Sequence, residues 1–330
     1  MEEREEMTGV GIRHLDFAEL APVEERVSLP VKRYAPRGRQ RKERPEVRNS
    51  LASAIAIRDK RGLTNRDYDL LHTMLILGVM STNQIQRLYW SKASSSKVVT
   101  NRLGKLWYRH LLDLTPDCQE YLDKMGMKAS SIYTLGKVGA AALYMRYGAN
   151  RRLMSERKRY QIGKGAALIY HDILVSEIYV RFVKLMQGRR DLFGWLGESQ
   201  GNIIEAGGRE LVRPDGTVTV GLPEGQAAFA IELDRGGSKW DEKVRAYDSV
   251  RDRQRWNQLE SETPYLDGVL IVVGKGRGSQ AREWIQAQGK LMPFYLKTWS
   301  EFVTLPIDEG WLDVKSDERT TLQPECLNGS

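Results

Sequence analysis

The stretch RPDGTVTVGLPEGQAAFAIELDRGG, residues 213–237, decides the fold of the second half of this chain. Residues 211–220 and 228–233 read as two strands, and the turn LPEGQ between them joins the strands into a hairpin. Antiparallel pairing brings the start of the first strand to the end of the second, so Asp215 and Glu232 fall at the same end. Glu232 and Asp234 are two residues apart and project to one face of the strand. The sequence therefore predicts three carboxylates at one tip of the hairpin.

Three converging carboxylates do not all stay ionised cheaply unless a cation lies between them. Mg²⁺ or Mn²⁺ suits such oxygen ligands, and a bound ion would polarise a phosphodiester and activate water. The alternative is structural, because Arg213, Arg235 or Lys243 would neutralise Glu232 equally well in an ion pair. The sequences PDG and DRGG are also ordinary turns. The residues alone leave a metal site and a salt bridge about equally open.

The elements around the hairpin predict an α/β unit with three layers. A buried strand is expected at 266–273, where LDGVLIVV is continuously apolar. The order along the chain is helix, three strands, helix and strand. The expected helices are at about 166–185, 238–256 and 279–288, and the other expected strands at 193–198 and 292–296.

The preceding unit reads as three short helices followed by a strand pair. The helices begin near Thr64, Ser81 and Ser94, the strands cover 111–114 and 132–135, and a covering helix runs over 136–147. This order is typical of a winged helix-turn-helix, with residues 115–130 as the wing. The third helix would contact DNA through its basic and amide side chains, Lys97, Asn101, Arg102, Lys105 and Arg109. The alternative is a surface helix whose charges only face water.

Charge and composition indicate the class of the molecule. The net charge of +8 suits a polyanionic partner, and residues 32–48 hold eight Lys or Arg against two Glu. The acidic amino terminus and the short apolar runs predict a protein without a signal peptide or membrane span. The only two cysteines, Cys118 and Cys326, lie in no metal-binding or redox spacing, so we expect a cytoplasmic, reduced protein. The expected organisation is a flexible basic arm (1–62), a winged-helix domain (63–150), an αβββαβ domain (160–305) and an acidic flexible tail (306–330).

Pro214-Asp215 followed by Glu232-x-Asp234 in this order of elements resembles the PD-(D/E)XK nuclease superfamily. The layout of a winged helix, RPDG and ELDRG over roughly residues 64–305 is similar to the plasmid replication-relaxation family. The resemblance implies an α+β and α/β protein with a restriction-endonuclease-like second domain, acting in replication, relaxation or transfer of a plasmid or other mobile genetic element. Its candidate partners are double-stranded DNA, other replication or transfer proteins and a second copy of the chain.

One departure from that superfamily leaves open whether this protein cleaves DNA. The third motif residue of the superfamily is a lysine two positions after the second acid, and here that position is Asp234. The resemblance therefore implies catalytic residues Asp215, Glu232 and Asp234, with Mg or Mn held by the three carboxylates. Lys243 on the following helix is the candidate for a relocated lysine, the alternative being ordinary helix surface beside Asp241 and Glu242. Glu177 is a candidate further acid. Three hypotheses follow: a DNA-binding factor with an inert nuclease-like domain, a metal-dependent endonuclease that nicks DNA, and a winged-helix transcriptional regulator.

Overall fold

The computed structural model describes the chain from residue 45 to residue 322 with several gaps. The described ranges are 45–59, 62–91, 95–115, 131–148, 165–186, 193–198, 200–222, 225–236, 238–259, 265–274 and 278–322. The predicted basic arm up to residue 44 and nearly all of the predicted wing, 116–130, lie outside these ranges. Within them the protein has nine helices and a seven-stranded mixed sheet. None of these helices has the length and apolar character needed to cross a bilayer.

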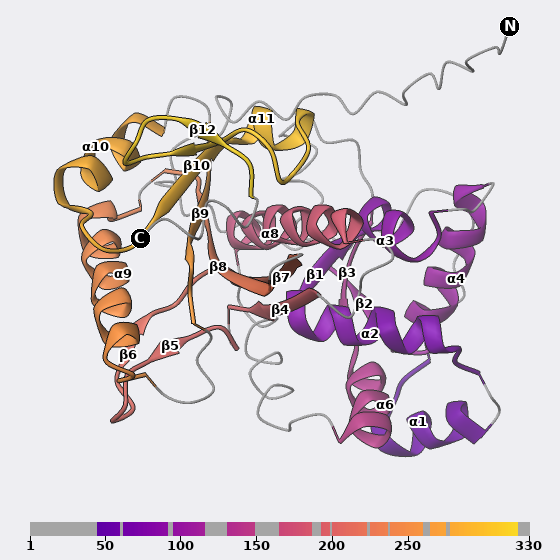
Figure 1. The fold of residues 1–330 in the computed structure, drawn as a ribbon. Coiled ribbons are helices and arrows are strands. Elements are labelled where there is room, and N and C mark those ends of the chain that lie inside the picture. Colours follow the sequence, from indigo (N-terminus) through magenta and orange to yellow (C-terminus); the bar gives the residue numbers. More distant parts are fainter. Residues whose placement is uncertain are drawn as a thin grey trace, which may run out of the picture.

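The amino-terminal unit is a set of helices around a small antiparallel sheet with strand order β1-β3-β2 (Figure 1). Its helices are α1 (Ser50–Asp59), α2 (Asn65–Leu77), α3 (Thr82–Tyr89), α4 (Ser96–Tyr108) and α6 (Lys137–Tyr147). Its strands are β1 (Val79–Ser81), β2 (Leu112–Leu114) and β3 (Ile132–Leu135). The strand β1 was not expected, because three residues after Gly78 are too few to show a period.

Short-range capping explains where these helices begin. Thr64 and Asp67 form a capping box at the start of α2, and Ser81 and Gln84 form another at the start of α3. The Ser95 side chain accepts from the Lys97 N–H at the start of α4. These contacts span at most three residues, which is why the starts were predictable.

Residues 50–59, predicted as part of a flexible arm, instead form α1, so that part of the prediction was wrong. The Asn49 side chain accepts from the Ala52 N–H at 3.0 Å at the start of the helix. The side chain of Ala54 is buried, and α1 packs against α6. The helix forms because it packs against α6, which is distant in the sequence. Its own residues show only weak apolar periodicity, so the sequence did not predict it.

The carboxyl-terminal unit is built on the seven-stranded sheet, with strand order β12-β11-β10-β9-β8-β7-β4. Strands β8 to β10 run parallel to one another, and the remaining neighbours pair antiparallel. Strands of the large sheet are β4 (Phe193–Gly197), β7 (Gly216–Leu222), β8 (Gly225–Asp234), β9 (Gly268–Val273), β10 (Phe294–Thr298), β11 (Trp311–Asp313) and β12 (Arg319–Thr320). A separate pair, β5 (Ile203–Ile204) and β6 (Glu210–Val212), lies near the end of α9.

Helices cover both faces of this sheet. They are α8 (Ala166–Leu185), α9 (Trp240–Arg255), α10 (Gly278–Gln288) and the short α11 (Trp299–Thr304). Alternate residues of β8 divide between two cores: Phe229 and Ile231 belong to the core that includes α8, whereas Ala228 and Ala230 pack with α9 and α10. The even-numbered positions therefore face α9, and this parity directs Glu232 toward that helix.

The carboxyl-terminal segment corrects a second prediction. Residues 306–322 were expected in a loose acidic tail, but β11 and β12 extend the sheet beyond β10. Trp311 is fully buried and donates from its indole nitrogen to the Ile307 carbonyl at 2.7 Å. The buried Lys297 ammonium donates to the carbonyls of Pro306 and Glu309 and lies over the Trp311 ring. Trp311 and the Lys297 side chain of β10 thus hold residues 306–314 against the sheet, although this segment shows no apolar periodicity.

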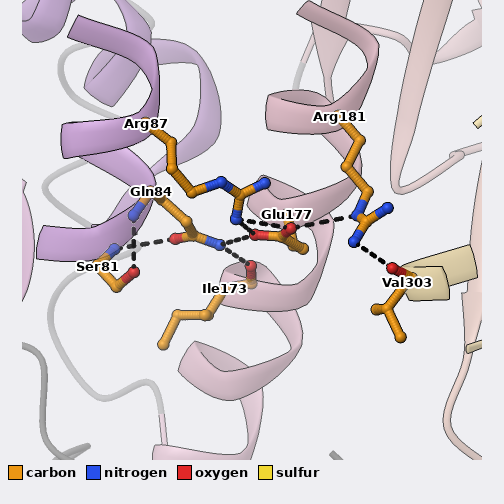
Figure 2. Close-up of polar contacts among 7 residues, drawn as sticks. All are labelled: Ser81, Gln84, Arg87, Ile173, Glu177, Arg181 and Val303. Atoms are coloured by element: carbon orange, nitrogen blue, oxygen red, sulfur yellow. Dashed lines mark hydrogen bonds and ion pairs between the residues drawn. The ribbon is translucent and has the colours of Figure 1, made fainter. Parts of the chain in front are cut away.

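Helix α8 joins the two units. It lies between the sheet and the elements α3 and β1 (Figure 1), and residues of both units belong to one continuous core. The Ser176 hydroxyl donates to the Val79 carbonyl at 2.6 Å, and the Gln84 amide donates to the Ile173 carbonyl at 2.9 Å. Figure 2 shows the second of these contacts beside the charged group Arg87, Glu177 and Arg181. The amino-terminal unit is therefore packed firmly against the first helix of the second unit.

Candidate functional site

Two of the three carboxylates predicted at one end of the hairpin, Asp215 and Glu232, meet there in the structure. Gly216 on β7 pairs with Ile231 on β8, and the Asp215 N–H donates to the Ile231 carbonyl at 3.1 Å. This register places Asp215 and Glu232 at the same end of the hairpin. Asp215 also accepts the Leu233 N–H at 2.7 Å through Oδ2, so its carboxyl group lies directly beside β8.

Glu232 is almost completely buried, and α9 provides its partners. Tyr247 donates its hydroxyl proton to Oε1 at 2.6 Å, and the Lys243 ammonium contacts Oε2. Lys243 and Tyr247 are four residues apart on α9 and therefore lie on the same face of that helix. The sequence offered Lys243 as one of three cations for Glu232, and Lys243 is the one that contacts it. Whether Lys243 acts in catalysis stays a prediction.

Burial and charge shift the pKa values of both partners. Burial raises the pKa of Glu232 to about 7, the neighbouring Asp215 carboxylate adds to the rise, and the Lys243 ammonium opposes it. Burial by itself lowers the pKa of Lys243, but the Glu232 and Asp215 carboxylates outweigh it, so the net shift of that pKa is upward. Lys243 therefore carries its charge next to both carboxyl groups.

His171 on α8 completes this group, and the sequence did not identify it. Its Nε2 lies 3.0 Å from Oδ1 of Asp215. Burial lowers the pKa of His171, but Asp215 raises it more, so the net shift is upward. Burial would raise the pKa of Asp215, yet its interaction with His171 and Lys243 leaves that pKa below the usual value. The only sequence signal was a histidine one turn into the helix that precedes the hairpin.

We call Asp215, Glu232, Lys243, Tyr247 and His171 the carboxylate cluster. Asp234, predicted as its third acid, does not join it. Its Oδ1 accepts from the Gly236 N–H at 2.8 Å and the Ser238 hydroxyl at 2.9 Å, and its Oδ2 accepts from the Trp240 indole at 2.7 Å. Asp234 thus ties the turn after β8 to the start of α9.

The cluster does not fit a resident divalent ion in this arrangement. Among the described residues, no group of three or more His, Cys, Asp or Glu side chains is placed to hold a metal. Each oxygen of Glu232 already has a protein donor, and the Lys243 ammonium occupies the position of a cation at Oε2. The Lys243 ammonium therefore supplies, from the chain itself, the positive charge expected beside the carboxylates.

The other residues considered as partners of this group point elsewhere. Arg213 pairs with Glu210 at 2.8 Å, and Arg235 donates to the Ala167 carbonyl at 2.6 Å. Glu177 lies on α8 but contacts Arg87 and Arg181 (Figure 2), so it is not a further acid of the cluster.

The predicted DNA-contacting side chains lie on α4. Val99, Leu103 and Leu106 form its buried stripe, whereas Val98 is exposed. On the outside, Lys97, Asn101 and Lys105 are exposed, and Arg109 follows at the carboxyl end of the helix. The Arg109 guanidinium makes a long contact, 3.4 Å, with the Gly62 carbonyl. These four side chains are available to a partner from solvent.

Arg102 behaves differently from the other four. Its Nε donates to Oδ1 of the buried Asp67 at 2.8 Å, and its Nη2 contacts Oδ2 of the same carboxylate and the Gly62 carbonyl. The hydrogen bond to Asp67 raises the pKa of Arg102, and burial of its guanidinium only partly offsets this. Asp67 belongs to the capping box of α2, so Arg102 connects α4 to α2. We therefore assign it to the fold rather than to a DNA contact.

An open hollow lies along the outer side of α4. Its lining combines the exposed polar residues of the helix with the chain just before α2: Gly62, Thr100, Asn101, Arg102, Gly104, Lys105, Tyr108 and Arg109. Four of the five predicted DNA-contacting residues are among them. The hollow and the carboxylate cluster are separate sites, one on each unit.

Comparison with known proteins gives one match. The family model described as Replication-relaxation matches residues 71–266, which is more than half of the chain. No curated protein and no solved structure is detectably similar to it. The matched residues begin in α2 and continue through α4, α8, the hairpin and α9. This chain belongs to the replication-relaxation family.

Proposed function

We propose that this protein binds double-stranded DNA through the outer side of α4 and acts in replication, relaxation or transfer of a plasmid or other mobile genetic element. The observation that carries the proposal is the division of α4 into a buried apolar stripe and an exposed side with Lys97, Asn101, Lys105 and Arg109. Family membership supports the biological setting.

The arrangement around α4 supports a winged helix-turn-helix. Helices α2, α3 and α4 are followed by the antiparallel pair β2 and β3, and β1 adds a third strand. In such units one helix enters the major groove of DNA. Lysine and arginine side chains on that helix bind phosphates and displace counterions, which makes binding depend on salt.

The second unit is proposed to be restriction-endonuclease-like and inert in cleavage. Apart from the separate pair β5 and β6, the order α8, β4, β7, β8, α9, β9 supports this, because it is the αβββαβ order of that fold. The closed contacts of Glu232 with Lys243 and Tyr247 support inertness. In this proposal the unit supports α4 and provides surface for other replication or transfer proteins.

The test is DNA binding measured by fluorescence anisotropy on a labelled duplex over a series of salt concentrations. The variant Lys97→Ala/Lys105→Ala should weaken binding and reduce the salt dependence by roughly two phosphate contacts, about 0.9 in slope for each. The matched control, Lys290→Ala/Lys315→Ala, removes the same charge from exposed positions on the other unit. Equal loss in both variants, or no binding by the wild type, would contradict the proposal.

A metal-dependent endonuclease is the alternative function. The observation that favours it is the meeting of Asp215, Glu232 and Lys243 at one end of the hairpin, which is where nucleases of the similar superfamily carry their acids and lysine. Mg or Mn binding there would require Lys243 to leave Glu232. Cleavage of plasmid DNA distinguishes the two functions.

A further inference from the structure

A glycine lies in the middle of α4. Gly104 is flanked by Leu103, which is buried, and Lys105, which is exposed. Glycine is among the poorest residues for a helix interior, because its backbone loses the most conformational freedom there. A glycine within a helix therefore has a cost that alanine would avoid, and the position calls for a physical reason.

The fold itself provides no reason. A Cβ built at Gly104 would meet no atom within 4 Å, and its φ is not in the left-handed region. Gly136 and Gly139, which flank the start of α6, are different, because a Cβ at either would lie 2.3 Å from a backbone oxygen of His110 or Leu111. Those two glycines are required by close packing inside the protein, whereas Gly104 faces open space.

The open space is the hollow beside α4. Asn101 lies one turn before Gly104 and Tyr108 one turn after it, and all three line the hollow. Both neighbours have polar side chains exposed to solvent, with Tyr108 39% exposed. Between the Asn101 amide and the Tyr108 ring, the surface of α4 thus consists of the Gly104 backbone alone. An alanine or a larger residue at position 104 would project its side chain into this space.

We propose that Gly104 is the point at which α4 makes its closest approach to the base edges in the major groove, and that Asn101 and Tyr108 on either side of it determine sequence preference. An asparagine amide pairs well with the N6 and N7 edge of adenine, and a ring packs on a thymine methyl group. Lys97 and Lys105 then bind phosphates and add affinity without sequence preference. The inference rests on the proposed function, DNA binding by α4.

The experiment selects DNA from a pool of duplexes with a randomised central segment, using the full chain as wild type and as Gly104→Ala. The selected wild-type duplex and a duplex of scrambled sequence are then titrated with both proteins. Gly104→Ala should bind the selected duplex about tenfold more weakly, the loss of one base contact, and the scrambled duplex as the wild type does. Its melting temperature should not fall, since alanine is the better helix former.

The control is Gly165→Ala, which adds a methyl group in open space at the start of α8, away from α4. It should leave both affinities unchanged. If Gly104→Ala selects the same sequence with the same affinity as the wild type, the inference is wrong although DNA binding stands. If the wild type binds no duplex, the proposed function itself fails, and the two failures are thereby distinguished.

Discussion

The Arg87 guanidinium on α3 donates from Nη1 to both carboxylate oxygens of Glu177 on α8, at 2.8 Å each (Figure 2). Glu177 also accepts from Arg181, whose Nη2 donates to the Val303 carbonyl of α11. One carboxylate thus stands between two guanidinium groups from two helices, and the resulting chain of contacts connects α3, α8 and α11. All three charged side chains are mostly shielded from solvent.

The first prediction concerns this junction. Glu177→Ala should lower the free energy of unfolding by about 2 kcal/mol, because two partly buried cations would lose their shared carboxylate. Urea unfolding followed by circular dichroism measures the change. The control is Glu242→Ala, which removes an exposed partner of Lys239 and should change stability by less than about 0.5 kcal/mol. Equal effects of the two substitutions would contradict a structural role for Glu177.

The second prediction concerns the pH dependence of stability. Since the pKa of Glu232 rises from 4.5 to about 7 on folding, the folded protein holds this proton more tightly than the unfolded chain does. That contribution is complete below pH 4.5 and is lost as pH rises to about 7. Glu232→Gln should therefore gain stability relative to wild type across this window, by up to about 3 kcal/mol. Parallel curves of unfolding free energy against pH for the two proteins would refute this.

The third prediction separates Arg102 from its neighbours on α4. Arg102→Met should lower the free energy of unfolding by about 2 kcal/mol, because the buried Asp67 would keep its charge without its partner. The DNA binding of Arg102→Met should depend on salt as that of wild type does. Lys105→Ala should instead reduce the slope of log affinity against log salt concentration by about 0.9. Denaturant unfolding and anisotropy on both variants provide the comparison. A stable Arg102→Met protein with a reduced slope would assign Arg102 to DNA after all.

The fourth prediction concerns cleavage. Supercoiled plasmid incubated with the purified protein and Mg²⁺ or Mn²⁺ should remain supercoiled, because both oxygens of Glu232 already have donors within the chain. Gel electrophoresis of the plasmid over time measures nicked and linear forms. If nicking is seen, the same assay on Glu232→Ala shows whether the carboxylate cluster is responsible for it. Nicking that disappears in this variant would establish the endonuclease alternative.

The fifth prediction concerns the carboxyl-terminal strands. Trp311→Ala should lower the free energy of unfolding by about 3–5 kcal/mol, because it empties a fully buried site on β11 and removes the ring beside Lys297. Trp256→Ala is the control, since the Trp256 side chain is 70% exposed. Thermal unfolding of both variants measures the difference. If Trp311→Ala is as stable as the control, residues 306–322 do not contribute to stability and the prediction is wrong.

Features that depend on neighbours in the chain were predictable. The capping pairs Thr64–Asp67 and Ser81–Gln84 define the starts of α2 and α3 within a few residues. The hairpin turn sets the register of β7 and β8, and with it the meeting of Asp215 and Glu232. The two-residue spacing of Glu232 and Asp234 likewise showed that they share one face of β8.

The partners of charged side chains were decided only by the tertiary structure. The sequence left several cations open for Glu232, and α9 packing against the sheet selected Lys243 and Tyr247. His171 reached Asp215 because α8 lies beside the hairpin, and Arg102 turned to Asp67 because α4 packs near α2. The physical reason is range: capping and strand register act over a few residues, whereas a buried charge takes whichever partner the packed helices bring within hydrogen-bond distance.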